Sequence, residues 1–256
     1  GILSDKIEVV NTGNILVGDS GAAVSGAVGI YTADASVSTD GDKVTVQGNG
    51  DTSSNIHPIG IYAQSSAALA SNKTVDINQG LGAMSISGKN GIGIYIEDNA
   101  GGKIILDNDS DITLSDSATE NDRKFAMFLS NAKNTANDTN AVITVGANNI
   151  GIYSKNSILT NSGTINAAYI GTGTRSIGVH NATDNGNFEF QNNGTINVTG
   201  AANIGISAVT AGTNTGAIRL GSGTINVTAT SFANGDIPIG VYAKGNNITI
   251  SSTTGN

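Results

Sequence analysis

The chain has 256 residues, with 12 Lys and Arg against 20 Asp and Glu, so its formal net charge is −8. A net acidic chain without a basic cluster is a poor candidate for binding nucleic acid or anionic lipid, because cationic contacts to phosphate supply most of that affinity. The absence of cysteine excludes disulfides, thiolate metal sites and a cysteine nucleophile. No apolar run reaches the roughly 18 residues of a membrane-spanning helix, so we expect no direct membrane insertion of this chain.

A short apolar segment with the pattern Ile-Gly-Ile-Tyr recurs along the whole chain. Its copies are VGIY at 28–31, IGIY at 59–62, IGIY at 92–95, FAMF at 125–128, IGIY at 150–153, IGVH at 177–180, IGIS at 204–207 and IGVY at 239–242. The starts of successive copies lie 25 to 35 residues apart. A loose period of this size indicates a repeat architecture.

Two further short apolar segments belong to most repeats. One is SGTIN at 162–166, NGTIN at 193–197 and SGTIN at 222–226, with KVTV at 43–46, TVDI at 74–77, DITL at 111–114 and VITV at 142–145 in the same place of earlier repeats. The weaker one is KIIL at 103–106, SILT at 157–160, FEF at 188–190, AIRL at 217–220 and NITI at 247–250. The pattern therefore predicts three strands of about four residues in each repeat, joined by linkers rich in Gly, Asn, Ser, Asp and Thr.

Three short strands per repeat predict a right-handed parallel β-helix of about eight coils. Helices are excluded because no window keeps apolar residues at helical spacing over three turns. A membrane barrel would need strands of roughly 10 residues, and a propeller would need four strands per repeat. One coil cannot fold alone, because two buried Ile contribute roughly 3–6 kcal/mol and ordering each of its residues costs roughly 1–2 kcal/mol. We expect one β-helical domain over 1–256, without capping segments and thus truncated at both ends.

Alternation along the strand assigns faces to the repeated segment. It predicts that Ile150 and Ile152 point inward while Gly151 and Tyr153 point outward. The equivalent outward positions form an aromatic column at Tyr31, Tyr62, Tyr95, Phe128, Tyr153, His180 and Tyr242. One interpretation is a stacked ladder that lies over the glycines and stabilises the register of the coils. The other is an exposed stripe that binds a protein or glycan, with Tyr31, Tyr62, Tyr95, Phe128, Tyr153 and Tyr242 as candidate binding residues.

Two motifs suggest catalysis or metal binding, and both have a simpler explanation. GDSGA at 18–22 resembles the loop around a serine-protease nucleophile, but Ser20 precedes His57, whereas a chymotrypsin-like enzyme has the order His, Asp, Ser. DNDSD at 107–111 spaces three carboxylates as in a calcium loop, but it lacks the turn glycine and the bidentate Glu of an EF-hand. We expect turns at both segments, no catalytic residue, no metal and no cofactor.

A polysaccharide lyase or hydrolase is the enzymatic alternative. Such an enzyme would need paired carboxylates, or carboxylates with a cation and a basic residue, on adjacent coils. The three arginines, Arg123, Arg175 and Arg219, have no evidently acidic context on a strand. We therefore expect a non-enzymatic protein and keep glycan cleavage as the alternative.

Asn166, Asn197 and Asn226 each follow a Thr-Ile pair, with Thr164, Thr195 and Thr224 on the same face. Side-chain amides at equivalent positions of successive coils can hydrogen bond to one another, so a structural ladder is predicted. The longest insertions, near 34–57, 115–124 and 229–238, are candidate binding loops.

The phrases GIGIY, GVYAKG and TNSGTIN resemble repeats in the passenger domains of large type V autotransporter adhesins, especially fusobacterial RadD-like ones. The resemblance covers about 29–250 and is specific as a style of repeat. It implies a surface-exposed stalk that attaches to host-cell or bacterial surface proteins or glycans, and it brings no catalytic motif. It also implies secretion to the bacterial cell surface and anchoring by a C-terminal outer-membrane β-barrel, which we expect to be missing from this chain.

Overall fold

The structure is a computed structural model that describes residues 1–19, 26–50, 57–78, 80, 82–168, 175–229 and 237–252. Within these ranges the chain forms 26 β-strands in three sheets, two three-residue 3-10 helices and no α-helix. The 3-10 helices are η1 (Gly41–Lys43) and η3 (Glu120–Asp122).

The strands of the three sheets alternate along the chain. Sheet A contains β1 (Ile2–Asp5), β4 (Val28–Ala33), β7 (Ile59–Ser65), β10 (Ile92–Asp98), β13 (Phe125–Ser130), β16 (Ile150–Lys155), β19 (Ile177–Ala182), β22 (Ile204–Val209) and β25 (Ile239–Lys244). Sheet B contains β2 (Val9–Asn11), β5 (Val37–Asp40), β8 (Lys73–Asn78), β11 (Ile104–Asn108), β14 (Asn134–Asn137), β17 (Ile158–Asn161), β20 (Phe188–Asn192), β23 (Gly216–Leu220) and β26 (Ile248–Ser252). Sheet C contains β3 (Ile15–Val17), β6 (Val44–Val46), β9 (Met84–Ile86), β12 (Ile112–Leu114), β15 (Val142–Val145), β18 (Thr164–Ala168), β21 (Thr195–Thr199) and β24 (Thr224–Thr228).

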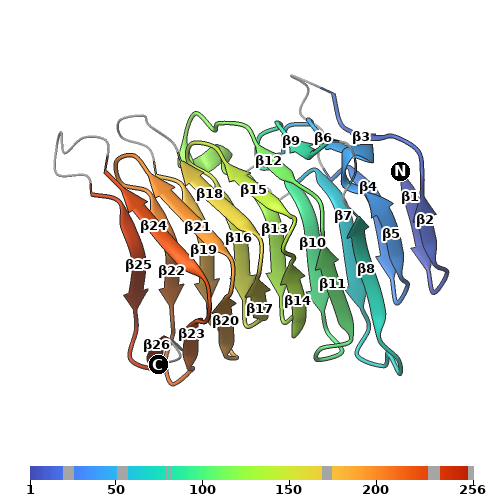
Figure 1. Cartoon of the computed structure of the whole chain (residues 1–256). Helices are drawn as coiled ribbons and strands as arrows, with labels where there is room; N and C mark the ends of the chain where they lie inside the picture. The colour runs from blue at the N-terminus through green and yellow to red at the C-terminus, as the bar shows by residue number, and fades with distance from the viewer. Residues whose placement is uncertain are drawn as a thin grey trace.

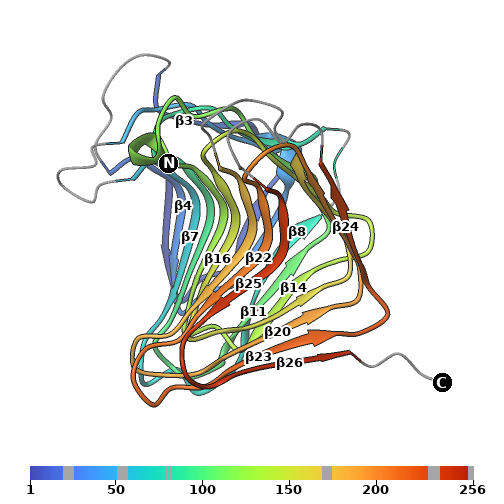
Figure 2. The same ribbon diagram turned by 90° about the vertical axis from the view of Figure 1, so that its left-hand side faces the viewer.

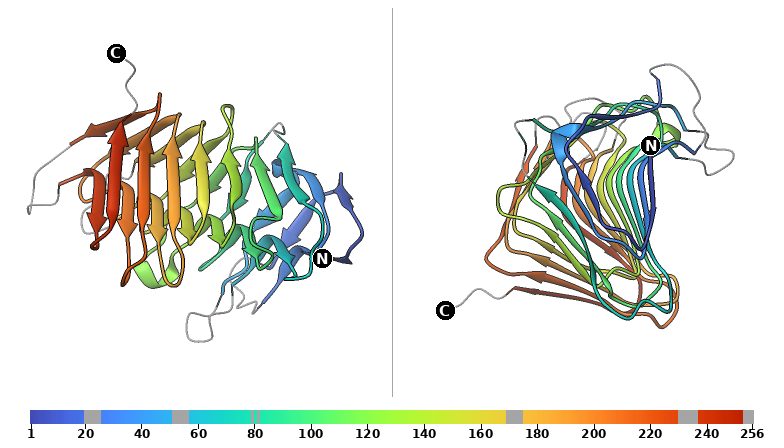
Figure 3. Two further views of the ribbon diagram at one scale, coloured as in Figure 1. Left: turned by 90° about the horizontal axis from the view of Figure 1, so that it is seen from below. Right: turned by 90° about the vertical axis from the view of Figure 1, so that its right-hand side faces the viewer.

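Each strand pairs in parallel with the equivalent strand of the next coil, so the chain is a parallel β-helix as predicted. The coils stack from the N-terminal to the C-terminal end, as Figures 1 and 3 show. Seen from the C-terminal end in Figure 2, the chain runs down sheet A, across sheet B and up sheet C while it advances toward the viewer, which makes the coil right-handed. The eight copies of the repeated segment lie in β4 to β25, and β1 adds a further strand before them.

The core is a set of columns in which equivalent side chains of successive coils lie above one another. In sheet A, Ile152 pairs with Met127 of the preceding coil and with Val179 of the following one, and all three are fully buried. Burying a side chain of this size contributes roughly 1.5–3 kcal/mol. Because the partners come from neighbouring coils, a strand with little apolar material of its own is still stabilised.

Two details of the strand assignment differ from the sequence prediction. TVDI at 74–77 lies in β8 of sheet B, and the sheet C strand of that coil is β9. The segment 34–57 is no single insertion either, because it contains β5, η1 and β6. Spacing alone could not separate the second strand of a coil from the third, since the linkers on both sides vary in length.

The predicted faces of the repeated segment are also partly wrong. Ile150 packs with Ile177 and Ile204 in a small apolar cluster against Tyr153, on the outer side of sheet A. Gly151 faces the core instead, since an added Cβ there would lie 2.5 Å from the carbonyl oxygen of Gly178 and 3.0 Å from Val145 Cγ2. The segment therefore breaks strict alternation at the glycine, and glycine is required because strand and core meet closely there.

Candidate functional site

The predicted aromatic column lies on the outside of sheet A and forms a ladder that is continuous from Tyr31 to His180. Register partners place the residues one above another, as in Tyr62 with Tyr95 and Phe128 with Tyr153. These two pairs are stacked, with ring centroids 4.7 and 4.6 Å apart. Tyr31–Tyr62 and Tyr95–Phe128 meet edge to face at 5.2 and 5.0 Å. Both geometries are favourable for aromatic pairs, so the ladder stabilises the register of the coils.

The rings of the ladder are half-buried, and Tyr242 is 40% exposed. The Tyr31 hydroxyl donates to Gln64 Oε1 over 3.0 Å, and the Tyr62 hydroxyl donates to Glu97 Oε2. Burial, together with the Glu97 carboxylate, raises the pKa of Tyr62 far above its usual value. The phenol therefore stays a neutral hydrogen-bond donor at neutral pH.

The ladder is interrupted once among the described coils, at Ser207 of β22. Ser207 pairs with His180 on one side and with Tyr242 on the other. His180 is the last ring of the continuous stack, with its centroid 5.2 Å from that of Tyr153, and its Nδ1 lies 3.0 Å from Ser207 Oγ. The sequence carries this signal in the repeat IGIS at 204–207, where a serine takes the ring position.

A pocket of about 580 Å³ lies at this interruption. The loop before β13 supplies part of its lining through Glu120 and Arg123, and Arg175 comes from the segment before β19. The whole lining is Glu120, Arg123, Arg175, Ile177, His180, Ile204, Ser207, Val209, Ile239, Tyr242 and Lys244. A pocket of this size is large enough to bind a small ligand or one unit of a polymer. We call this pocket the notch.

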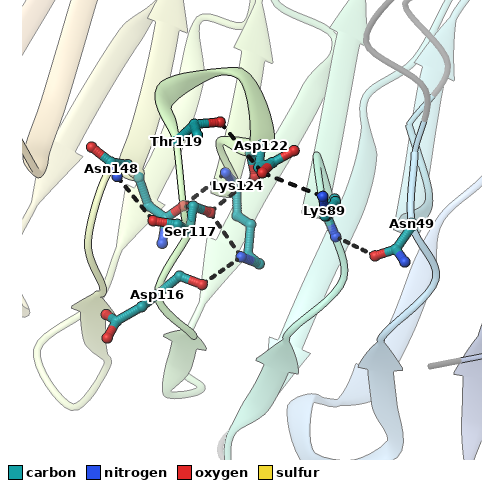
Figure 4. A network of polar contacts seen from close by, with 9 residues as sticks. Asn49, Lys89, Asp116, Ser117, Thr119, Asp122, Lys124 and Asn148 are labelled. Atoms are coloured by element: carbon teal, nitrogen blue, oxygen red, sulfur yellow. Dashed lines mark hydrogen bonds and ion pairs between the residues drawn. The ribbon is translucent and has the colours of Figure 1, made fainter. Parts of the chain in front are cut away.

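The loop 115–124, one of the predicted binding loops, is held in place by a buried lysine. Lys124 is 2% exposed, and its Nζ donates to the Asp116 carbonyl oxygen at 3.0 Å and to Ser117 Oγ at 2.8 Å (Figure 4). Asp122 of the same loop forms an ion pair with Lys89 of the preceding coil at 3.5 Å (Figure 4). The contacts of Lys124 give the loop a defined position beside the ladder, although nothing in the sequence indicated that this lysine is buried.

Within the described residues, the other predicted loops and motifs do not form a site. Ser20 and residues 230–236 lie outside the described residues. His57 Nδ1 lies 2.9 Å from the carbonyl oxygen of Asn90. Among the described residues, no group of three or more His, Asp or Glu is placed to hold a metal ion, and no helix is long and apolar enough to cross a membrane.

The carboxylates of the predicted calcium segment interact with residues of neighbouring coils. Asp111 Oδ1 accepts a hydrogen bond of 2.9 Å from the Val142 amide. Asp107 forms a hydrogen bond with Asp138, and burial together with this contact raises the pKa of Asp138. Asp138 therefore keeps its proton to a higher pH than an isolated carboxyl group does.

The asparagine ladder is confirmed, and a second one was missed. On the outside of sheet C, Asn197 Nδ2 donates to Asn166 Oδ1 at 2.8 Å, and Asn226 Nδ2 donates to Asn197 Oδ1 at 2.9 Å. A second ladder of fully buried amides lies inside the corner between sheets B and C and consists of Asn108, Asn137, Asn161 and Asn192. Since the members of each ladder bond mainly to one another and to nearby backbone, both serve the structure.

No family model matches this chain, and no curated protein or solved structure matches it either. The geometry described above is therefore the basis for the function.

Proposed function

We propose that this chain is a segment of a bacterial surface adhesin, a β-helical stalk that displays side chains and loops for attachment to host cells or other bacteria. The observation that carries the proposal is the aromatic ladder, which lines one face of the solenoid beside the ordered loop 115–124. Aromatic side chains that are partly exposed in a row are suited to bind a protein or a glycan.

The solenoid itself suits the role of a spacer. Nine strands of sheet A, stacked at about 4.8 Å, give a body on the order of 40 Å long, and every further coil would lengthen it equally. The core columns and the buried asparagine ladder run from coil to coil, so the body is stiff along its axis. A stiff spacer of this kind carries a binding surface away from a membrane, which agrees with the proposed location on the bacterial cell surface.

Cleavage of a glycan is the second candidate function, and the Asp107–Asp138 pair is the observation in its favour. A carboxyl group with a raised pKa beside a second carboxyl group is the kind of pair that glycosidases use. In glycosidases, however, the two groups lie at least roughly 5 Å apart so that the sugar fits between them. A pair joined by a hydrogen bond is closer than that, so we favour the adhesive function.

The test uses the purified chain immobilised on beads. We expect the beads to bind host cells or bacteria that beads coated with an unrelated β-helical protein do not bind. Soluble chain added in excess should compete. In parallel, the chain is incubated with a panel of acidic and neutral polysaccharides, and their length is followed by size-exclusion chromatography. Shortening of any polysaccharide, lost in Asp138→Asn, would replace the adhesive function with the enzymatic one.

A further inference from the structure

The notch is the one place in the described ladder where an aromatic ring is missing. Ladder neighbours that stack elsewhere have centroids 4.6 to 5.2 Å apart. His180 and Tyr242 are two coils apart, and two steps of a parallel stack correspond to about 9.6 Å. The space beside Ser207, between the rings of His180 and Tyr242, is therefore thick enough for one more ring.

The floor of the notch combines apolar and polar groups. Ile177, Ile204 and Ile239 line it from three successive coils. Beside them lies the contact between Ser207 Oγ and His180 Nδ1. Burial and the nearby Arg123 lower the pKa of His180, which keeps the ring neutral at neutral pH. A sugar ring matches such a floor, because C–H groups at its edge can contact the isoleucines while its hydroxyl groups bond to Ser207.

Cations line both ends of the notch. Arg123 is already engaged, since it donates to the Asn148 carbonyl oxygen at 3.1 Å and pairs with Glu120 at 3.4 Å. Within the described part of the chain, the side chains of Arg175 and Lys244 have neither a hydrogen-bond nor an ion-pair partner. Arg175 precedes β19 and Lys244 is the last residue of β25, so the two cations lie toward opposite ends of the strands.

The sign of this local charge is opposite to that of the whole chain. Three cations and one carboxylate line the notch, whereas the chain carries a net charge of −8. Two of its three arginines, Arg123 and Arg175, are at this pocket, and the third, Arg219, lies on sheet B in a 2.7 Å ion pair with Glu189. A concave site lined by cations attracts an anionic ligand, even where the protein as a whole is acidic.

We propose that the notch binds an acidic glycan, with one pyranose ring between His180 and Tyr242 and with its anionic groups at Arg175 and Lys244. A lone aromatic side chain of a peptide would also fit between two rings, but it would leave both cations unpaired and Ser207 without a partner from the ligand. A carboxylated or sulfated sugar chain satisfies all three, because its charges recur along its length. The inference rests on the proposed function, which supplies the cell-surface glycan.

Two variants and a matched control test the notch. Ser207→Tyr restores the ring that the other coils carry and fills the space, so it should keep the fold and abolish binding. Arg175→Gln removes one unpaired cation and should weaken binding by at least about tenfold. Arg219→Gln removes an arginine on another sheet and should leave the affinity within about twofold of wild type. Circular dichroism and thermal unfolding establish that each variant is folded.

The probes are a galacturonic acid tetrasaccharide, a chondroitin sulfate tetrasaccharide and the neutral maltotetraose, titrated into the full 256-residue chain by calorimetry. We expect binding of one or both acidic probes and none of maltotetraose, and the first two probes distinguish carboxylate from sulfate recognition. Equal binding of maltotetraose, unchanged binding by Ser207→Tyr, or equal effects of Arg175→Gln and Arg219→Gln would overturn the proposal. So would binding of the peptide Asp-Phe-Asp at the notch in the absence of any glycan binding.

The same variants separate this inference from the adhesive function. If beads coated with Ser207→Tyr attach to cells as well as wild-type beads do, the notch is not the adhesive site and the adhesin proposal stands. If the tetrasaccharides bind at the notch but wild-type beads attach to no cell, the notch proposal stands and the adhesive function fails.

Discussion

The side-chain amide of Asn137 donates a hydrogen bond of 2.9 Å to Oδ1 of Asn161 in the next coil, inside the solenoid and away from water. Asn161 in turn donates to Asn192 at 2.8 Å. Each amide thus satisfies the one before it, and a polar column runs through a core that is otherwise mostly apolar. The arrangement ties adjacent coils together without a repeated hydrophobic residue, and it makes the stability of one coil depend on the next.

The first prediction concerns this buried ladder. Asn161→Ala should lower the free energy of unfolding by about 2–4 kcal/mol, because Asn137 and Asn192 each retain a buried polar atom without its partner. Urea denaturation measures the change. Asn197→Ala in the outer ladder removes the same type of bond where solvent can replace it, so we expect a loss within about 1 kcal/mol. Equal losses in the two ladders would contradict a distinct role for burial.

The second prediction concerns the glycine of the repeated segment. Gly151→Ala should destabilise the protein by about 1–3 kcal/mol, because the added methyl group meets the Gly178 carbonyl oxygen and Val145. Ala126 takes the equivalent position in β13 and is fully buried there, so the coil of FAMF is the natural exception. Ala126→Gly is the matched control and should change the unfolding midpoint less than Gly151→Ala does. Unchanged stability of Gly151→Ala would contradict this prediction and show that the strand moves aside at little cost in free energy.

Part of this architecture could be predicted from the sequence because it depends on a single local pattern that repeats. The column of Tyr62 and Tyr95 follows from one position of the repeat, and so does the outer Asn166–Asn197 ladder. Strand β14 has the sequence NTAN, which has no strand pattern of its own, and it is a strand because β11 and β17 pair with it on both sides. Such a strand cannot be predicted from the sequence of its own coil alone.

The site was harder to predict than the fold, for two physical reasons. The reversal of faces at the glycine places the first isoleucine of the repeated segment on the outer side, as Ile150, Ile177 and Ile204 show. Ile177 and Ile204, together with Ile239, form the floor of the notch. The notch itself also needs residues from coils that are far apart in sequence, such as Arg123 and Lys244. The only local signal was a serine in the ring position of the repeat, at Ser207, and a missing side chain is easily read as mere variation.

The third prediction concerns a buried amide without a partner. Asn181 of β19 is fully buried, and neither its Oδ1 nor its Nδ2 has a hydrogen-bond partner among the described residues. Its register partners are Ser154 and Ala208. Asn181→Leu keeps the branched heavy-atom skeleton, with bulkier methyl groups, and removes two unsatisfied polar atoms, so it should raise the free energy of unfolding by about 1–2 kcal/mol. The same substitution at the bonded Asn192 should lower it, and a loss at both positions would show that Asn181 needs its polar groups.

The fourth prediction concerns pH and the Asp107–Asp138 pair. The pKa of Asp138 is raised in the folded protein, by burial and by Asp107, so the folded chain binds this proton more tightly than the unfolded chain does. Stability from this group is therefore present at low pH and is lost as the pH rises through the raised pKa. Asp138→Asn should make the protein more stable than wild type at neutral pH, and the gain should disappear below the ordinary Asp value near 3.8.

The control for this effect is Asp5→Asn. Asp5 is exposed at the end of β1, so removal of its charge should change the free energy of unfolding by less than about 0.5 kcal/mol. Urea denaturation of both variants across the acid range gives the comparison. A gain in Asp138→Asn that is the same at every pH would rule out the linked proton as its cause.

The fifth prediction concerns the buried lysine that positions the loop beside the notch. Burial lowers the pKa of Lys124, although the nearby Asp122 and Asp116 favour its charged form. The ammonium group has lost its water shell, and its hydrogen bonds within the loop replace it. Lys124→Ala should lower the free energy of unfolding by about 1–3 kcal/mol, because Ser117 and the Asp116 carbonyl lose their donor. It should also speed hydrogen exchange of the amides of 117–123, as the loop is released.

Lys89→Ala is the matched control, since it removes the exposed partner of the Asp122 ion pair and should cost less than about 1 kcal/mol. If the loop positions Arg123 for the notch, Lys124→Ala should weaken binding of the acidic tetrasaccharides while Lys89→Ala leaves it nearly unchanged. Faster exchange with undiminished binding would mean that Arg175 and Lys244 hold the ligand without the loop. In that case the binding site would consist of the ladder rings with Arg175 and Lys244, without a contribution from the loop 115–124.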